Sequence, residues 1–484
     1  MRLTFVGHQT LLAETKSGSL LVDPILVSGF GGDSVSGEVE IYPPRWVDAS
    51  RMPVPRGVVL THEHSDHFNI PSLTLLPRAV PVFVGPLMID AVVECIGALG
   101  FQVTRIPFGC TQQLGDLEFT LFPAGYETVL WEARVSQVHI AFTEERELGG
   151  VLLVVDALIS DEFREAVDAG TWPPPRVVAV SNNAQVTPIG VFGSLDNLKA
   201  KPTQPSGNFP GLAILHSLVC GYFQGAYTLR GTDILITGGG FLKDYPEMGP
   251  FPFSEQKDLA KAASVLLSGL RVHGPLPGEA YELTPDGLIS APPADWIRLD
   301  QDRFRALRER RRAFLAASQA LEMKPRLPPL TDAEEAEAVS VVSAELNEVV
   351  VPLLLSPLGR SVLRTSAQTL AIKLLTAHQG DLDFVLDATT GRFEPRCGVP
   401  LPQLTAEHPF GLVVAVQDFR AVLSGQLQIW DLAGVAMRAW YEGPAEESIV
   451  AFLYGYYGEQ VQPGRACKAY WDHLDDTSGA GVPM

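Results

Sequence analysis

The stretch Val58-Val59-Leu60-Thr61-His62-Glu63-His64-Ser65-Asp66-His67 joins an apolar strand to a cluster of polar side chains. Its first three residues form a short apolar run bounded by polar residues, which predicts the end of a buried strand. His62 and His64 are two residues apart, so their side chains point the same way on an extended chain. Asp66 and His67 follow where the chain should turn into a helix, and they can face the same spot from another side.

The composition of this cluster indicates a metal site. Imidazole and carboxylate are good ligands for zinc, iron and manganese. The chain of 484 residues has only 10 histidines, and three of them lie in this stretch. Such clustering favours a metal site over the alternative, which is a polar surface loop after a strand.

The pattern His-x-His-x-Asp-His after an apolar strand resembles the signature of the metallo-β-lactamase superfamily. Residues 5–10 (FVGHQT) and 20–24 (LLVDP) resemble the opening hairpin of one branch of that superfamily. This branch includes ascorbate-6-phosphate lactonase, N-acyl-phosphatidylethanolamine phospholipase D and CMP-N-acetylneuraminate hydroxylase. The resemblance covers about the first 280 residues and is most specific in residues 1–70. It implies an α/β fold, namely an αββα metallo-β-lactamase-like sandwich followed by a smaller α+β C-terminal domain.

The length of the chain predicts two or three domains. A proline-rich stretch at 273–298 closes the first one, and a capping box at 331–334 opens a later helix. Residues 418–425 resemble part of the sterol-carrier type of lipid-binding domain, with a plain α+β accessory or dimerisation domain as the alternative. The predicted division is 1–290 (metal-binding domain), 291–330 (helical linker), 331–470 (α+β accessory domain) and 471–484 (loose tail).

The net charge and the cysteine content limit the classes of partner and the cellular compartment that we expect. The net charge of −20, from 36 Lys+Arg and 56 Asp+Glu, disfavours nucleic acid and anionic membranes. Five scattered cysteines without a Cys-x-x-Cys fit a reducing compartment. The N-terminus lacks the apolar region of a signal peptide, and no apolar run reaches the roughly 18 residues of a membrane span. We expect a cytoplasmic protein that acts on a small molecule, without a membrane span; the composition leaves a homo-oligomer open.

Two later residues are candidate ligands because of the resemblance. It implies that His139, about 70 residues after the cluster, is the third metal histidine, although a lone histidine in a strand is usually a packing residue. It also implies that Asp156 bridges two metal ions. Asp156 follows the apolar run Val151–Val155, and a carboxylate buried there without a partner would be costly. The alternative for Asp156 is a helix N-cap.

The last metal histidine of the family would follow the strand 233–237, where this sequence has three glycines. His216 is the nearest upstream histidine and a candidate ligand, with a packed helical histidine as the alternative. The residues expected around the ligands, as an outer shell or pocket, are His8, Asp23, Asn182 and Asn183. For His8 and Asp23, a strand-end contact and a turn are the respective alternatives.

The assembled site predicts a metal-dependent hydrolase. A metal-bound hydroxide would attack a small-molecule ester, lactone, amide or phosphodiester, with Asp66 as a catalytic residue that orients the nucleophile. The expected cofactor is zinc, as one or two ions, with iron or manganese as alternatives. The competing functions are an iron-dependent oxidoreductase on the same fold and a non-catalytic binding protein, which the missing histidine favours.

Overall fold

The computed structural model describes residues 1–30, 39–125, 134–143, 149–157, 159–181, 198–199, 233–238, 241–242, 244–245, 249–250, 255–266, 270–315, 323–356, 370–387, 390–427, 432, 436–442 and 465. The chain divides into two compact units. The first comprises Met1–Gly32, Glu38–Val186 and Asn208–Ala317, and the second Asp33–Gly37, Thr187–Gly207 and Ser318–Met484.

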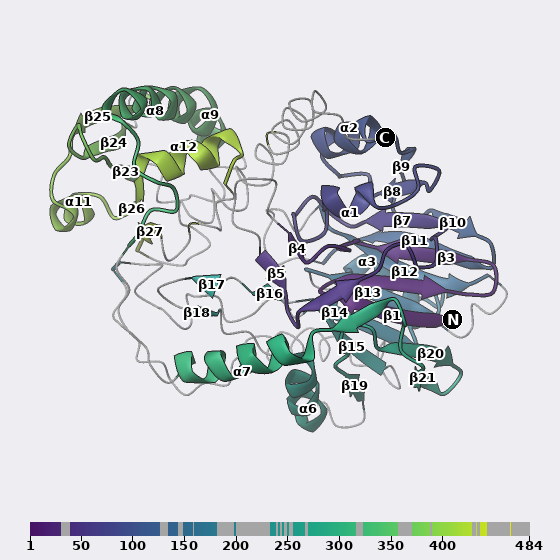
Figure 1. Ribbon diagram of the computed structural model, residues 1–484. Coiled ribbons are helices and arrows are strands. Elements are labelled where there is room, and N and C mark those ends of the chain that lie inside the picture. Colours follow the sequence, from purple (N-terminus) through teal and green to yellow (C-terminus); the bar gives the residue numbers. More distant parts are fainter. Residues whose placement is uncertain are drawn as a thin grey trace, which may run out of the picture. The chain divides into compact units, whose positions relative to one another are not determined.

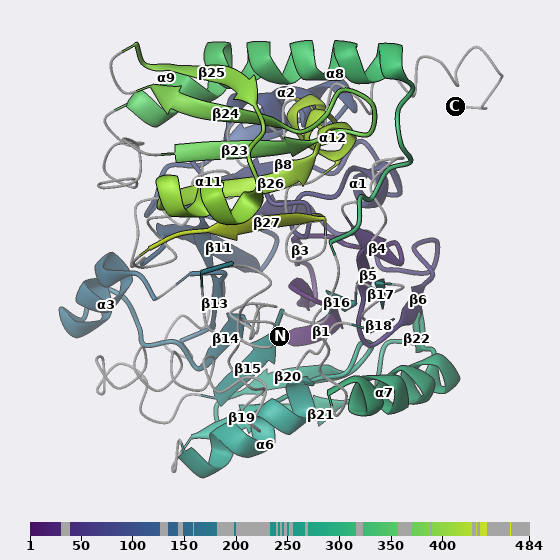
Figure 2. The same cartoon turned by 90° about the vertical axis from the view of Figure 1, so that its left-hand side faces the viewer.

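The first unit is a mixed α/β structure with two large sheets (Figures 1 and 2). The first sheet has antiparallel hairpins at one side and parallel strands at the other. Its strands, in spatial order, are β21 (Gly287–Ala291), β20 (Ala280–Thr284), β1 (Arg2–Gly7), β2 (Thr10–Glu14), β3 (Ser19–Val22), β7 (Gly57–Leu60), β8 (Val82–Val84) and β9 (Val103–Arg105).

The second sheet repeats this mixture. Its first four strands pair antiparallel, and the last four pair parallel. In spatial order they are β10 (Thr111–Leu114), β11 (Leu117–Pro123), β12 (Ser136–Phe142), β13 (Val151–Val155), β14 (Val177–Ser181), β15 (Asp233–Thr237) and β19 (Arg271–His273). Because β13, β14 and β15 run parallel, their carboxyl ends lie at one edge of this sheet.

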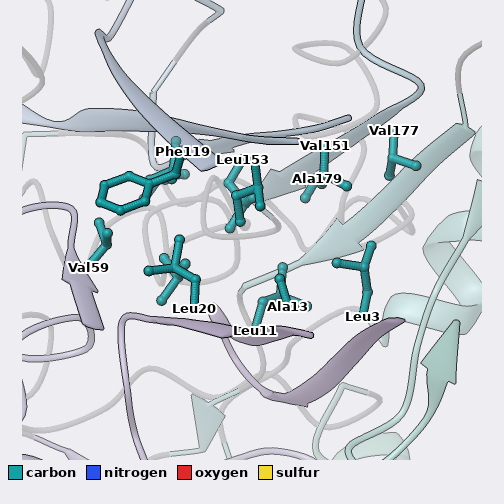
Figure 3. Packing of buried hydrophobic residues seen from close by; sticks show 14 of the residues in the cluster. Leu3, Leu11, Ala13, Leu20, Val59, Phe119, Val151, Leu153, Val177 and Ala179 are labelled. Atoms are coloured by element: carbon teal, nitrogen blue, oxygen red, sulfur yellow. The ribbon is translucent and has the colours of Figure 1, made fainter. Parts of the chain in front are cut away.

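One buried apolar cluster joins the two sheets. Leu3, Leu11 and Leu20 of the first sheet pack with Phe119 and Leu153 of the second, and all five are almost fully buried (Figure 3). The alternation of side chains along each strand supplies this inner face, as expected for sheets that bury one side against each other. The sheets therefore share a core, and the loops at their ends are held in fixed positions.

Helices and short strands surround this core. Phe163 of α3 and Leu259 of α6 pack on the outer face of the second sheet. In the described part of this unit the helices are α1 (Ile70–Thr74), α2 (Asp90–Ala98), α3 (Asp161–Asp168), α6 (Gln256–Leu266) and α7 (Gln301–Leu315). The short strand pairs are β4 (Gly29–Phe30) with β5 (Val39–Ile41), β5 with β16 (Phe241–Leu242), β17 (Asp244–Tyr245) with β18 (Gly249–Pro250), and β6 (Arg45–Val47) with β22 (Ile297–Leu299).

The segment expected to be a linker contains structured elements. Within 291–330, β22 pairs with β6, and α7 packs Phe304 against Tyr42 of the first unit. The arginines of α7 pair with the chain's own acids, Arg303 with Glu40 and Arg308 with Glu255. The structure therefore places residues 291–317 in the first unit, and the basic face of α7 neutralises nearby carboxylates.

The second unit contains a five-stranded mixed sheet. Its order is β25 (Arg392–Cys397), β24 (Leu382–Asp387), β23 (Leu370–Leu375), β26 (Phe410–Ala415) and β27 (Met437–Trp440), with only β23 and β26 parallel. Its helices are α8 (Asp332–Glu345), the π-helical turn η3 (Leu346–Val350), α9 (Val351–Leu355), α11 (Leu401–Glu407) and α12 (Val416–Ser424). The predicted capping box is present, because Thr331 and Glu334 bond each other's backbone N–H.

One helix of the described residues meets the length and hydropathy criteria for a membrane span. It is Asp332–Leu355, with 24 residues and a mean hydropathy of 1.7 over its most apolar window. Near its start, the buried carboxylate of Glu335 accepts hydrogen bonds from the backbone of residues 377–379. Buried core helices meet the same criteria, so no membrane location follows from this helix.

Candidate metal centre

The predicted ligands gather where several strands of the first unit end. The loop 61–69 follows β7 and contributes three histidines and Asp66, while Asp156 directly follows β13. His8 lies in the turn between β1 and β2, and Asp23 directly follows β3. Strands that share a core thus bring residues far apart in the sequence to one edge of the structure.

The backbone at this edge is unusual. His8, Asp23 and Val155 are the three non-glycine residues with positive φ among those described, at 53°, 45° and 61°. A β-branched residue such as Val155 rarely adopts this conformation, and such strain concentrates at functional sites. The backbone twist at Val155 turns the chain directly before Asp156.

Two groups of three side chains form the candidate metal centre. In the first, ligand atoms of His62, His64 and Asp156 all lie within 4.8 Å of one another. In the second, ligand atoms of His8, Asp66 and His67 satisfy the same limit. The groups are linked, because His67 Nε2 lies 3.0 Å from Asp156 Oδ2.

Asp23 fixes the orientation of two ligand histidines. Its Oδ2 accepts hydrogen bonds from His67 Nδ1 at 2.7 Å and from the Thr61 hydroxyl at 2.7 Å, and its Oδ1 accepts from Thr61 N–H at 2.8 Å. The Thr61 hydroxyl, with its proton on Asp23, can only accept from His62 Nδ1, 3.1 Å away. His62 and His67 are therefore both left with Nε2 facing the site, which is how outer carboxylates prepare ligand histidines.

The electrostatics match a site built for a cation. Burial alone would lower the pKa of His67, but Asp66, Asp156 and Asp23 outweigh burial and hold that pKa well above its usual value. Burial would raise the pKa of Asp156, but His67 opposes it and holds the pKa well below the usual range. For His62, burial and the neighbouring His67 lower the pKa, so its imidazole is neutral. Buried carboxylates around a protonated imidazole indicate that positive charge is stabilised here.

The donor spacing fits a metal ion. A tetrahedral ion bound at about 2.0–2.1 Å sets neighbouring ligand atoms about 3.3 Å apart. The atom pairs His62 Nε2–His64 Nδ1, His8 Nε2–Asp66 Oδ2 and His67 Nε2–Asp66 Oδ2 are 2.9, 2.9 and 3.6 Å apart. Four imidazoles and two carboxylates are also the ligand types that zinc, iron and manganese accept.

Two contacts that were not predicted from the sequence also hold the cluster in place. Arg134 forms an ion pair with Glu63, which lies between His62 and His64, at 2.5 Å. Gln9 Nε2 donates to Asp156 Oδ1 at 2.9 Å. Gln9 directly follows His8 and Glu63 lies inside the histidine motif, so adjacency to ligands was the only signal in the sequence.

The structure brings together His8, Asp23, His62, His64, Asp66, His67 and Asp156, but not His139. His139 lies in the middle of β12, where its Nε2 donates to the carbonyl of Gly149 at 2.8 Å. Its ring packs against Phe163 and Trp172 on the outer face of the second sheet. As a correction to the sequence interpretation, we therefore omit His139 from the proposed ligands, because strand alternation turns it toward α3. His216, Asn182 and Asn183 lie outside the described residues.

No protein-family model matches the chain. Uncharacterized proteins of Mycobacterium bovis and Mycobacterium tuberculosis are each 25% identical to it over 141 residues, which is 27% of this chain. The matching region spans 37% of the length of these curated relatives. The relatives thus share a segment with this chain and carry no described activity.

Among solved structures, the chain is similar to proteins named as metal-dependent hydrolases. A possible metal-dependent hydrolase from Veillonella parvula has a TM-score of 0.39 and 18% identity, covering 58% of this chain and 98% of that one. Isothiocyanate hydrolase from Delia radicum gut bacteria has a TM-score of 0.39 and 14% identity, covering 60% and 100%. The diiron β-hydroxylase CmlA from Streptomyces venezuelae has a TM-score of 0.35 and 16% identity, covering 56% and 52%. At these scores the similarity by itself decides neither fold nor function.

Proposed function

We propose that the chain is a metal-dependent hydrolase whose first unit is an αββα sandwich of the metallo-β-lactamase type. The observation that carries this proposal is the convergence of two triads, His62–His64–Asp156 and His8–Asp66–His67, at one end of two sheets that share a core. A polar loop without a function would not be expected to have a carboxylate such as Asp23 behind it, which fixes the rings of His62 and His67 so that their Nε2 atoms face the site.

In the proposed reaction, the bound metal and Asp66 would have different roles. Bound zinc would supply Lewis acidity and a water whose pKa falls to about 7. Asp66 keeps its ionised form, because His67 and His8 outweigh the effect of burial and lower its pKa. Its side chain is 13% exposed, compared with 0% for His8 and His67, so Asp66 lies on the solvent side of its triad. We assign Asp66 the task of orienting the nucleophile toward a substrate that enters from solvent.

The proposed substrates are small molecules with an ester, lactone, amide or phosphodiester bond. Within the superfamily, the sequence of residues 1–70 favours the branch of the lactonase and phospholipase D types. Zinc is the proposed metal, as one or two ions, because all the donors are imidazole or carboxylate and two triads are present. The accessory unit is proposed to contribute to substrate selection.

An iron-dependent oxidoreductase is the second candidate. The observation in its favour is the donor set itself, since histidines mixed with two carboxylates suit non-haem iron as well as zinc. The two functions differ in the metal that the purified protein retains and in whether turnover consumes an oxidant.

The test is elemental analysis of protein purified without added metal, followed by assays on a panel of lactones and phosphodiesters. Zinc with turnover supports the hydrolase, and iron with visible absorbance supports the oxidoreductase. Less than half an equivalent of any metal, even after reconstitution, contradicts both functions. The His64→Ala variant should lose metal and turnover while it keeps its fold, and His139→Ala is the matched control that should keep its metal. Unchanged metal content in His64→Ala would refute the site assignment.

A further inference from the structure

Strand β15 ends beside the candidate metal centre but supplies it with no histidine. The last metal histidine was expected directly after β15, where the sequence has Gly238, and the residue that ends β15 is Thr237. Strand β15 lies beside the parallel strand β14 (Figure 1). Thr237 is 1% exposed and pairs in register with Ser181 of β14. A buried hydroxyl at a strand end needs a hydrogen-bond partner, and its partner shows how β15 contributes to the site.

Thr237 reaches the cluster through Gln9. The Thr237 hydroxyl lies 2.7 Å from Gln9 Oε1, and Gln9 Nε2 lies 2.9 Å from Asp156 Oδ1. Gln9 is 5% exposed, so water competes little with either contact. Next to this chain of bonds, the N–H of Gly238 donates to the carbonyl of His8 at 2.7 Å, which ties β15 to the turn that carries Gln9.

The direction of these hydrogen bonds follows from the groups present. Asp156 is ionised and can only accept, so Gln9 must present its NH₂ group to the carboxylate and its carbonyl oxygen to Thr237. The Thr237 hydroxyl donates to that carbonyl oxygen at 2.7 Å, a shorter contact than the 3.2 Å to the Val180 carbonyl, whereas a flipped amide would place its oxygen against the Asp156 carboxylate. Oδ1 of Asp156 is thus held by Gln9, while Oδ2 points toward His67 Nε2 at 3.0 Å.

We propose that Thr237 and Gln9 are positioning residues that hold Asp156 so that it offers only its Oδ2 oxygen to a metal ion. This inference rests on the proposed metal centre and deepens it. Strand β15 serves the site through two hydrogen bonds in place of a side-chain ligand. Residue 238 ties β15 to the turn that carries Gln9 through its backbone N–H, and its φ of 67° favours glycine at this position.

The test measures metal affinity rather than turnover. The apo forms of the wild type and of three variants, Gln9→Met, Thr237→Val and Thr237→Ser, are titrated with Zn²⁺ in competition with a chromophoric chelator. Gln9→Met and Thr237→Val keep size but lose the hydrogen bond, and we expect each to weaken Zn²⁺ binding by about 10–100-fold. Thr237→Ser keeps the hydroxyl and should stay within about threefold of the wild type, since the bond to Gln9 remains.

A double variant and an independent spectrum make the result decisive. We call the two hydrogen bonds from Thr237 through Gln9 to Asp156 the relay. If the two residues act only through this relay, the double variant Gln9→Met/Thr237→Val should lose no more Zn²⁺ affinity than Gln9→Met alone. The absorption spectrum of bound Co²⁺ should also change in Gln9→Met, because the carboxylate is free to rotate. A purely structural role would lower the melting temperature of the apo protein without altering either readout.

The outcomes separate this inference from the proposed function. Wild-type affinity in folded Gln9→Met overturns the relay and leaves the hydrolase proposal intact. Weaker Zn²⁺ binding in the variants supports the relay even if no panel substrate is hydrolysed. A wild-type protein that binds no Zn²⁺ overturns both.

Discussion

Replacing Asp23 with asparagine should weaken metal binding at the candidate centre while the protein stays folded. The backbone at Asp23 has φ of 45°, a region that asparagine adopts readily, so the substitution brings no backbone strain. Asparagine can keep an oxygen toward the Thr61 N–H, but it then presents an NH₂ group to His67 Nδ1, which donates to Asp23 in the wild type. In the neutral form of His67, which is the form that binds a metal ion, the conflict is relieved if the single proton sits on Nε2, and this removes the lone pair that the ion needs.

The loss of metal affinity in Asp23→Asn depends on which of the two orientations of the asparagine amide costs less free energy. The opposite amide orientation would leave the buried Thr61 N–H without an acceptor, at about 1–3 kcal/mol. We therefore expect the tautomer shift, with metal affinity reduced about 10–100-fold. This corresponds to about 1.4–2.7 kcal/mol of binding free energy.

The assay is competition titration of the apo proteins with Zn²⁺, with denaturant unfolding measured in parallel. Asp233→Asn is the matched control. Asp233 is equally buried in the same unit but bonds Arg271 and the backbone of Leu288, so this variant should lose stability and keep its Zn²⁺ affinity. Zn²⁺ affinity of Asp23→Asn within twofold of the wild type would refute the assignment of Asp23 as the residue that orients His67.

Two other perturbations have definite outcomes. Asp66, Asp156 and Asp23 hold the pKa of His67 well above its usual value, so the metal-free imidazole keeps its second proton to higher pH and donates to Asp156, and Zn²⁺ binding should release that proton. Zn²⁺ affinity should rise about tenfold per pH unit below that raised pKa and level off above it. Calorimetry in two buffers of different ionisation enthalpy measures the proton release, and a heat of binding that is the same in both buffers would contradict the release. The same protonation stabilises the metal-free fold; this contribution is fully present below the usual pKa of 6.5 and is lost as pH rises through the raised value. The guanidinium of Arg45 donates to the backbone carbonyls of Val6, Ile25 and Val27, so Arg45→Lys should lose about 1–3 kcal/mol of unfolding free energy. The exposed control Arg51→Lys should change by under about 0.5 kcal/mol in denaturant unfolding, and equal values for the two variants would count against this role of Arg45.

The local features of the site were predictable because each depends on neighbouring residues. An apolar strand followed by His-x-His-x-Asp-His predicts both β7 and the ligand loop, and the structure has them at Gly57–Leu60 and 61–67. The hairpin near residues 2–25 and the capping box at Thr331 likewise follow from turn residues and side-chain spacing. Asp156 could be inferred because a carboxylate after a buried strand needs partners, and His67 and Gln9 are among them.

The contacts that depend on register and packing could not be read from the sequence. His139 was selected by its distance along the chain, but a shift of one residue in a strand reverses the face on which a side chain lies. In β12, Val138 and Ile140 take the core between the sheets, which leaves His139 on the opposite face. Gln9 and Thr237 are 228 residues apart, and no local pattern indicates that their side chains meet.

The most direct test is the position of a metal ion in crystals of the wild-type protein grown with Zn²⁺, located by anomalous scattering at the zinc edge. We predict a peak about 2.0–2.2 Å from ligand atoms of His62, His64 and Asp156, or of His8, Asp66 and His67, or a peak at each triad. An anomalous map with no peak within coordination distance of either triad would contradict the metal centre on which the proposed function depends.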